Sequence, residues 1–151
     1  MFSLFDKKEY GMIAAGLVYK DDKVLLIKSQ KRGWELPGGV VEQGESIFDG
    51  LKREISEESG VIAEPEKMVG IYQRLSSKPG YGPLEGMVLP TTVIMTFICT
   101  YVGGAETFSN ESIAVGWFAP NEAFTTPYID HWICCKNIIA AYKIPFSLCP
   151  F

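Results

Sequence analysis

The chain has 151 residues, of which 47% are hydrophobic and 21% charged, and a formal net charge of −4, as expected for one globular domain with a sizeable core. The acidic balance and the lack of any lysine- or arginine-rich run argue against binding a nucleic-acid polymer through its phosphates. The opening sequence MFSLFDKKEY has too short an apolar run for a secretory signal or a membrane span, so we expect a cytoplasmic protein with no membrane partner.

The first part of the chain predicts an antiparallel hairpin followed by a glycine-rich loop. Two β-rich runs between Gly11 and Ser29 flank a polar turn at residues 20–23, which is a hairpin pattern. In the next segment, QKRGWELPGG, Pro37 favours an extended conformation for the residue before it, and Gly38 and Gly39 allow the backbone to approach a ligand closely. Such a loop could present carbonyl groups to a metal ion.

A helix is predicted from Ile47 to Ser59, with Ser46 as its N-cap and Gly60 as its C-terminal stop. At helical spacing one stripe is apolar, and the neighbouring stripe carries carboxylates: Ile47, Phe48, Leu51 and Ile55, then Glu54, Glu57 and Glu58. Like charges three or four residues apart each destabilise a helix by about 0.2–0.5 kcal/mol, so we expect a cation at this face. Arg53 lies four residues before Glu57 and could orient that one carboxylate.

The second half of the chain predicts further strands, two loops and a final helix. The expected strands are Val61–Ala63, a run from Met68 to Leu75 after an interruption at Pro65, Thr91–Val102 and Ile113–Phe118. The expected loops are Ser76–Pro90 and Ala105–Ser112, and helical turns are expected from Pro120 and over Tyr128–Tyr142. Long loops in compact domains are often functional, so Ser76–Pro90 is a candidate lid or specificity loop. The pattern predicts a mixed α/β domain.

One stretch, from Gly39 to Val61, carries a fixed pattern of residues. Gly39 is followed after five residues by Glu45, after seven more by Arg53-Glu54-Ile55, and then, at single-residue gaps, by Glu57-Glu58 and Gly60-Val61. This spacing resembles the Nudix box at every specified position. The lead-in sequence WELPG, the strand ending in Trp117-Phe118 and the C-terminal helix are also similar to that family, so the resemblance covers most of the chain.

The resemblance implies a single Nudix hydrolase domain over residues 1–151, built as an α/β/α sandwich with a mixed central β-sheet. It also implies divalent-metal-dependent hydrolysis of a nucleoside diphosphate linked to another moiety, so the expected partner is a small nucleotide or nucleotide-sugar-like diphosphate. The residue chemistry agrees, because Mg²⁺ and Mn²⁺ prefer carboxylate, carbonyl and phosphate oxygens. A metal ion there would neutralise phosphate charge and assist the attack of water on phosphorus.

The resemblance also implies a role for each matching position. It gives Glu57 and Glu58 as principal metal ligands, Glu54 as a ligand or general base, the Gly39 carbonyl as a backbone ligand, Arg53 as the arginine that orients a glutamate, and Glu45 as a supporting residue. Some members take their general base from a late loop, so Glu106 and Glu111 are alternatives to Glu54, and Glu111 is the preferred loop candidate. A surface carboxylate is the alternative interpretation of both.

Substrate contacts are predicted less sharply. Lys28 and Arg32 could meet phosphates, and Tyr72, Arg74 or Tyr81 could touch a base or sugar. Solvated charges and ordinary strand aromatics are the competing interpretation. The only histidine, His131, is expected to have a capping or core role.

Three functions fit the pattern. The first is hydrolysis of a diphosphate linkage, and the second is a non-catalytic Nudix module that senses a nucleotide and regulates a partner. The third is isoprenoid diphosphate isomerisation, for which no cysteine and glutamate are persuasively placed. A homodimer is common among similar proteins.

Overall fold

The computed structural model describes residues 11–30, 32–74, 78–79, 88–89 and 92–125. The predicted helix Tyr128–Tyr142, His131, Tyr81 and most of the loop Ser76–Pro90 lie outside the described residues. No helix in the described part of the chain is long and apolar enough to cross a membrane.

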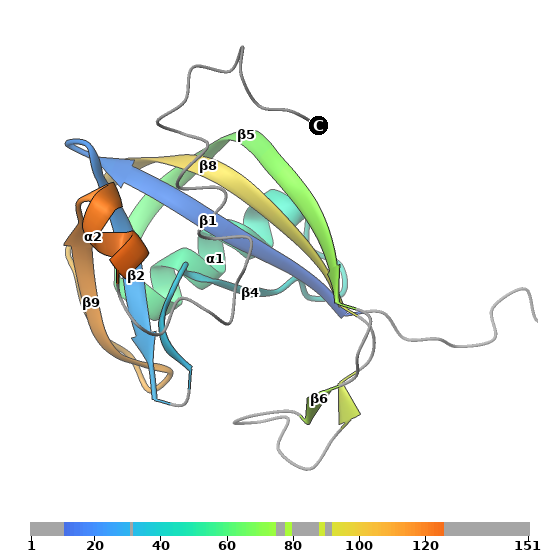
Figure 1. The fold of residues 1–151 in the computed structure, drawn as a ribbon. Helices are drawn as coiled ribbons and strands as arrows, with labels where there is room; N and C mark the ends of the chain where they lie inside the picture. The colour runs from blue at the N-terminus through green and yellow to red at the C-terminus, as the bar shows by residue number, and fades with distance from the viewer. Residues whose placement is uncertain (1–10, 31, 75–77, 80–87, 90–91, 126–151) are drawn as a thin grey trace, which may run out of the picture.

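The described strands form one mixed sheet in the order β3-β2-β1-β8-β5, and β4 pairs with β1 and β9 with β2 (Figure 1). Their bounds are β1 Gly11–Lys20, β2 Lys23–Ser29, β3 Gly33–Glu35, β4 Gly38–Val40, β5 Val61–Arg74, β8 Thr92–Gly104 and β9 Ser112–Phe118. Strands β1 and β8 are parallel, and every other described pair in this sheet is antiparallel. Two short strands, β6 (Lys78–Pro79) and β7 (Val88–Leu89), pair separately within the predicted loop.

The two faces of the sheet carry separate cores. Helix α1 (Ile47–Ser59) packs Leu51 and Ile55 against one face, and α2 (Pro120–Thr125) packs Ala123 against the other. Alternation along β1 divides the strand between the two cores, because Val18 contributes to the first and Leu17 to the second, both fully buried. A mixed sheet between helices confirms the predicted α/β/α arrangement.

The predicted hairpin is confirmed by its turn. Asp21 and Asp22 have φ values of 48° and 60°, and Lys20 pairs with Lys23 across them. Two consecutive residues with positive φ are what a two-residue hairpin turn of the right twist requires, and aspartate tolerates that region better than most residues.

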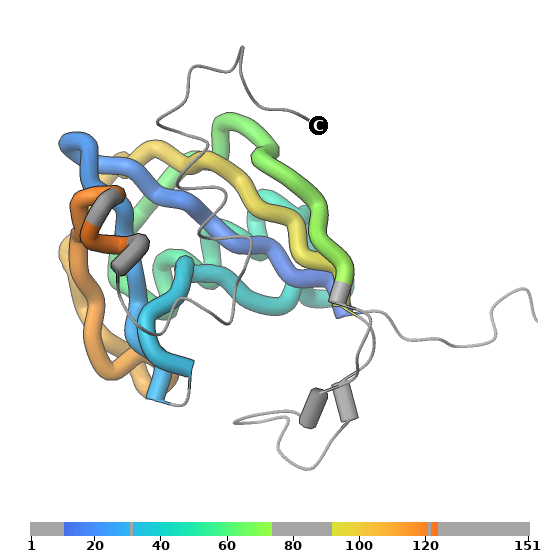
Figure 2. The backbone as a smooth tube through the Cα atoms, viewed as in Figure 1, coloured from blue at the N-terminus to red at the C-terminus, as the bar shows by residue number. Residues whose placement is uncertain are grey.

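Strand β5 corrects the prediction of an interruption at Pro65. Figure 2 shows the backbones of β5 and β8 running side by side, and their pairing extends from Val61 to Arg74. The register shifts between Pro65 and Lys67 instead of the strand ending. Because β5 lies at the edge of the sheet, a residue without an N–H can be tolerated there.

Three smaller expectations also need correction. The expected loop before the box contains the short strands β3 and β4, and β8 continues through Gly103 and Gly104. Phe48 is 51% exposed, although its ring contacts Phe97 edge-on. It is the second residue of α1 and so lies at the end of the apolar stripe.

Candidate active site on helix α1

The two ends of α1 are fixed by local hydrogen bonds that the sequence predicts. The Ser46 hydroxyl accepts a hydrogen bond from the Asp49 N–H at 3.1 Å and donates one to the Asp49 carboxylate at 2.6 Å. At the other end Gly60 has φ 72°, and its N–H donates to the Ser56 carbonyl at 2.9 Å. The helix therefore runs from Ile47 to Ser59, as predicted, and fixes the position of every glutamate on it.

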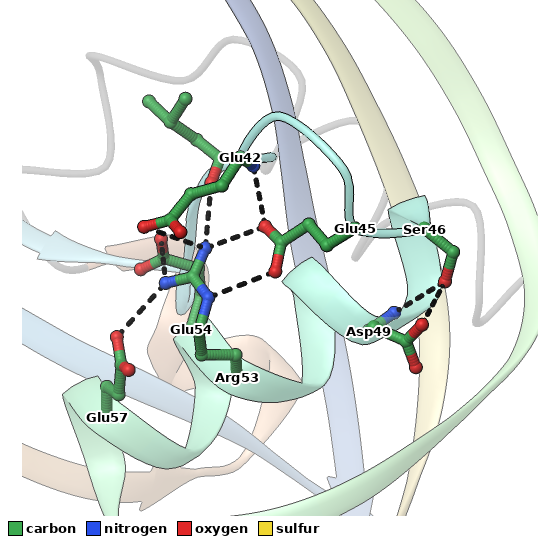
Figure 3. Close-up of polar contacts among 8 residues, drawn as sticks. Glu42, Glu45, Ser46, Asp49, Arg53, Glu54 and Glu57 are labelled. Atoms are coloured by element: carbon green, nitrogen blue, oxygen red, sulfur yellow. Dashed lines mark hydrogen bonds and ion pairs between the residues drawn. The ribbon is translucent and has the colours of Figure 1, made fainter.

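Arg53 lies at the centre of a carboxylate cluster (Figure 3). Its guanidinium donates to Glu45 at 2.8 and 3.2 Å, to Glu54 at 2.8 Å and to Glu57 at 3.1 Å. A fifth hydrogen bond, at 3.0 Å, reaches the Val40 carbonyl. The predicted pairing of Arg53 with Glu57 is confirmed. The expectation that Arg53 orients only one carboxylate is wrong, because its planar guanidinium holds three carboxylates and a strand carbonyl together.

These contacts stabilise the charged forms of Arg53 and Glu45. Hydrogen bonding to Glu45 is the largest of the effects that raise the pKa of Arg53. The hydrogen bond from Arg53, and then one from the Glu42 N–H, lower the pKa of Glu45. Glu45 is therefore the fixed anionic partner of Arg53, which is consistent with its implied supporting position.

Glu58 lies in a different environment from the other box glutamates. It is only 5% exposed, and its Oε2 accepts a hydrogen bond from the Gly38 N–H at 2.8 Å. The pKa of Glu58 is raised to about 8, and burial is the largest cause. The hydrogen bond from the Gly38 N–H lowers the pKa, whereas the charges of Glu35, Glu54 and Glu111 raise it. The sequence places Glu58 on one stripe with Glu54 and Glu57 but does not predict its burial, which depends on the contact of α1 with the start of strand β4 at Gly38.

Glu54 lies between Arg53 and the glycine loop. Burial raises its pKa, the hydrogen bond and charge of Arg53 lower it, and the charges of Glu57 and Glu111 raise it. The carboxyl group lies so close to Gly39 that a Cβ built there would be 2.5 Å from it. Glycine is thus required at position 39 for the carboxylate of Glu54 to approach the loop backbone.

The donor set fits a divalent cation in its chemistry. Glu54, Glu57, Glu58 and the Gly39 backbone supply hard oxygen donors, and the charged forms of Glu54 and Glu58 are disfavoured by burial and by neighbouring carboxylates. Within the described residues no three acidic, histidine or cysteine side chains form a preformed metal-binding group. In this arrangement Arg53 holds Glu54 and Glu57, and the Gly38 N–H holds Glu58.

The two loop candidates for a general base lie in different surroundings. Glu111 is exposed, and its charge acts on both Glu54 and Glu58. Glu106 instead accepts a hydrogen bond from the indole N–H of Trp117, and its pKa is lowered first by its own backbone N–H and then by Trp117. The surroundings of Glu111 are thus compatible with a general base next to the α1 glutamates, whereas the hydrogen bond of Glu106 to Trp117 indicates a structural role.

Among the described residues, the predicted substrate contacts do not form a cluster as the glutamates of α1 do. Arg32 forms three hydrogen bonds of 2.7–3.1 Å with Glu35, and Lys28 lies 6.0 Å from the centre of the Trp34 ring. Tyr72 packs against the second core, Arg74 is the last residue of β5, and Tyr81 lies outside the described residues. A phosphate would have to compete with Glu35 for Arg32.

The sequence did not single out Glu35, which the structure places next to the cluster. Glu35 is 3% exposed, is paired with Arg32, and raises the pKa of Glu58. A charged residue between Trp34 and Leu36 in the WELPG segment was the available signal, because buried charges require partners. The effect of its charge on Glu58 could not be inferred, because it depends on the fold that brings β3 near α1.

Comparison with known proteins matches this chain and its fold to one family. The NUDIX domain model matches residues 10–137. A MutT-like protein of Streptomyces ambofaciens is 35% identical over 115 residues, which cover 75% of this chain and 66% of that protein. An ADP-ribose pyrophosphatase of Methanocaldococcus jannaschii is 37% identical over 93 residues, covering 59% and 50%. The crystal structure of a MutT protein from Bacillus halodurans superimposes with a TM-score of 0.67 at 28% identity, covering 85% and 82%.

The chain therefore belongs to the Nudix hydrolase family, which confirms the resemblance in the sequence. It spans about two thirds and one half of the lengths of the two relatives above.

Proposed function

We propose that this protein hydrolyses a diphosphate linkage in a small nucleotide-containing substrate, with the α1 face as its catalytic centre. The observation that carries the proposal is the gathering of Glu54, Glu57 and Glu58 around Arg53 and the glycine loop, within the residues that the NUDIX domain model matches. The ADP-ribose pyrophosphatase activity named for one relative makes a nucleoside diphosphate joined to a sugar the first substrate class to test.

The residues of this chain have separable tasks in the proposed reaction. Arg53 holds Glu54 and Glu57 at fixed positions on one turn of α1, and Glu45 fixes the guanidinium from the other side. The Gly38 N–H fixes the Glu58 carboxylate against the loop. Holding reacting groups in place in this way lowers the entropic part of a barrier without any covalent step by the protein.

Glu54, Glu57, Glu58 and the Gly39 carbonyl are the groups that we propose to hold Mg²⁺, or Mn²⁺. Such an ion supplies charge neutralisation for phosphate oxygens and activation of water. The raised pKa values of Glu54 and Glu58 support this assignment, because an added cation would favour both carboxylates in their charged forms.

We assign the general base to Glu111, with Glu54 as the alternative. Glu54 is held by Arg53 at 2.8 Å and is therefore partly occupied as a proton acceptor. Glu111 is exposed at the edge of the cluster, where it can accept a proton from an attacking water. A Glu111→Gln variant is expected to lose about 100- to 10,000-fold in kcat, and a variant with near-parental kcat would remove Glu111 from this role.

The proposal is tested by incubating the protein with a panel of diphosphates that includes ADP-ribose, with and without Mg²⁺. We expect hydrolysis of at least one of them that requires the metal ion and is lost in Glu57→Gln and Glu58→Gln. Binding of a nucleotide without turnover, and with an affinity that does not depend on metal, would instead identify a non-catalytic nucleotide sensor. The predicted cytoplasmic location and homodimer remain predictions from the sequence.

A further inference from the structure

We propose that Ser109 and Ser112 are positioning residues, which hold the loop carboxylate Glu111 beside the glutamates of α1. This inference rests on the proposed function, because it concerns the geometry of the same catalytic centre. It assigns a task to two serines that belong to neither the box nor the substrate contacts predicted above.

The two serines build the turn that carries Glu111. The Ser109 hydroxyl accepts hydrogen bonds from the backbone N–H groups of Glu111 at 3.2 Å and Ser112 at 3.3 Å. The Ser109 N–H donates in return to the carbonyl and the hydroxyl of Ser112, each at 3.1 Å. Both N–H groups at the tip are thus satisfied by one side chain, a type of local bond that fixes tight turns.

Ser112 attaches this turn to the last turn of α1. Its hydroxyl, which is fully buried, donates a hydrogen bond to the main-chain carbonyl of Glu58. The adjacent Ser59 carbonyl accepts from the Thr107 N–H at 2.8 Å. The last carbonyls of a helix have no partner within it, and here the loop supplies partners, one of them on the residue whose carboxylate belongs to the cluster.

A second attachment fixes the opposite end of the same loop. There Glu106 accepts a hydrogen bond from the indole N–H of Trp117 in β9. The loop is thus attached at Glu106 and Thr107 on one side of Glu111 and at Ser112 on the other. The Ser109–Ser112 turn therefore sets the position of Glu111 relative to Glu58. Glu111 lies close enough for its charge to raise the pKa values of Glu54 and Glu58.

The experiment compares each serine variant in two backgrounds, the parent protein and Glu111→Gln. Ser109→Ala removes the acceptor for the Glu111 N–H, Ser112→Ala releases the turn from α1, and Ser109→Thr keeps the hydroxyl. Ser59→Ala is the matched control, because it removes another fully buried hydroxyl from the same helix end, bonded to Ile55 and Val61 but not to the turn.

We expect Ser109→Ala and Ser112→Ala to lower kcat by about 100-fold in the parent, the scale of a displacement of about 1 Å, with little change in KM. In the Glu111→Gln background the same changes should have almost no further effect, because residues that act through one group are not additive. Ser109→Thr should restore most of the activity. Ser59→Ala should change kcat by the same factor in both backgrounds.

Amide hydrogen exchange of the metal-free protein supplies a readout independent of turnover. Ser109→Ala should increase exchange at the Glu111 and Ser112 N–H groups while Ile55 within α1 stays protected. Equal losses of kcat in both backgrounds, no loss at all, or unchanged exchange at Glu111 would overturn the inference while leaving the proposed function intact. A parent protein that hydrolyses none of the diphosphates would refute the proposed function and this inference with it.

Discussion

At the scale of single residues, Arg53 organises the candidate site more than any glutamate does. It holds Glu45, Glu54 and Glu57 through one planar group, which the single ammonium of a lysine cannot reproduce. We predict that Arg53→Lys leaves the fold intact but lowers kcat/KM about 10- to 100-fold, the range found when groups that orient metal ligands are lost. Steady-state kinetics and a thermal melt check both parts.

The neighbouring residue provides the control for this prediction. Lys52 forms an ion pair with Glu64 at 2.5 Å, and both side chains are well exposed. Such pairs contribute only about 0–1 kcal/mol, so Lys52→Met should change neither activity nor the melting temperature appreciably. Parental kcat/KM in Arg53→Lys would show that the guanidinium is dispensable.

The buried carboxylate of Glu58 predicts how the stability of the metal-free protein varies with pH. Burial raises its folded-state pKa from 4.5 to about 8, so between these values the folded state binds more protons than the unfolded state. The free energy of unfolding therefore falls as the pH rises from about 4.5 to 8. Urea unfolding in the presence of a chelator should show this fall in the parent and a flatter profile in Glu58→Gln, and the same slope in both would contradict the assignment.

At the scale of elements, the glycine loop and α1 form one unit. A Cβ at Gly39 would meet the end of the flexible Glu54 side chain, whereas a Cβ at Gly103 would meet nothing within 4 Å. Gly39→Ala should therefore keep the fold and displace the Glu54 carboxylate, with kcat reduced by up to about 100-fold. Gly103→Ala is the matched control and should retain parental kcat. If Gly39→Ala also retained parental kcat, the position of the Glu54 carboxylate would not matter for catalysis.

The elements also show which features could be predicted from the sequence. The bounds of α1 depend on hydrogen bonds within a few residues, from Ser46 at one end and Gly60 at the other, so the sequence predicts them well. The continuity of β5 through Pro65 depends on its place at the sheet edge, which no local pattern reveals. The bond from Ser112 to Glu58 joins residues 54 apart in the chain, and it could not be predicted before the fold was known.

The candidate site follows the same division. The box identified Arg53, Glu54, Glu57 and Glu58 because their spacing on one helix is a local property. It did not predict that Arg53 would hold three carboxylates, because Glu45 and the Val40 carbonyl reach it only through the fold of the preceding loop.

At the scale of the whole molecule, the carboxylate cluster predicts that folding and cation binding are linked. An ion that binds only the folded state raises the free energy of unfolding by RT ln(1 + [L]/Kd). Millimolar Mg²⁺ should therefore raise the melting temperature of the parent, and the rise should be reduced in a Glu57→Gln, Glu58→Gln double variant. An equal shift in both proteins would place the cation elsewhere.

The most direct test of the proposed function is a single-turnover reaction in ¹⁸O-labelled water, using the best substrate of the diphosphate panel. We predict that the parent places the label in a product phosphate only when Mg²⁺ is present, and that Glu57→Gln slows this incorporation strongly. Labelled product formed without a metal ion, formed equally fast by Glu57→Gln, or carrying the oxygen on carbon would contradict the proposal that the α1 carboxylates direct water to phosphorus.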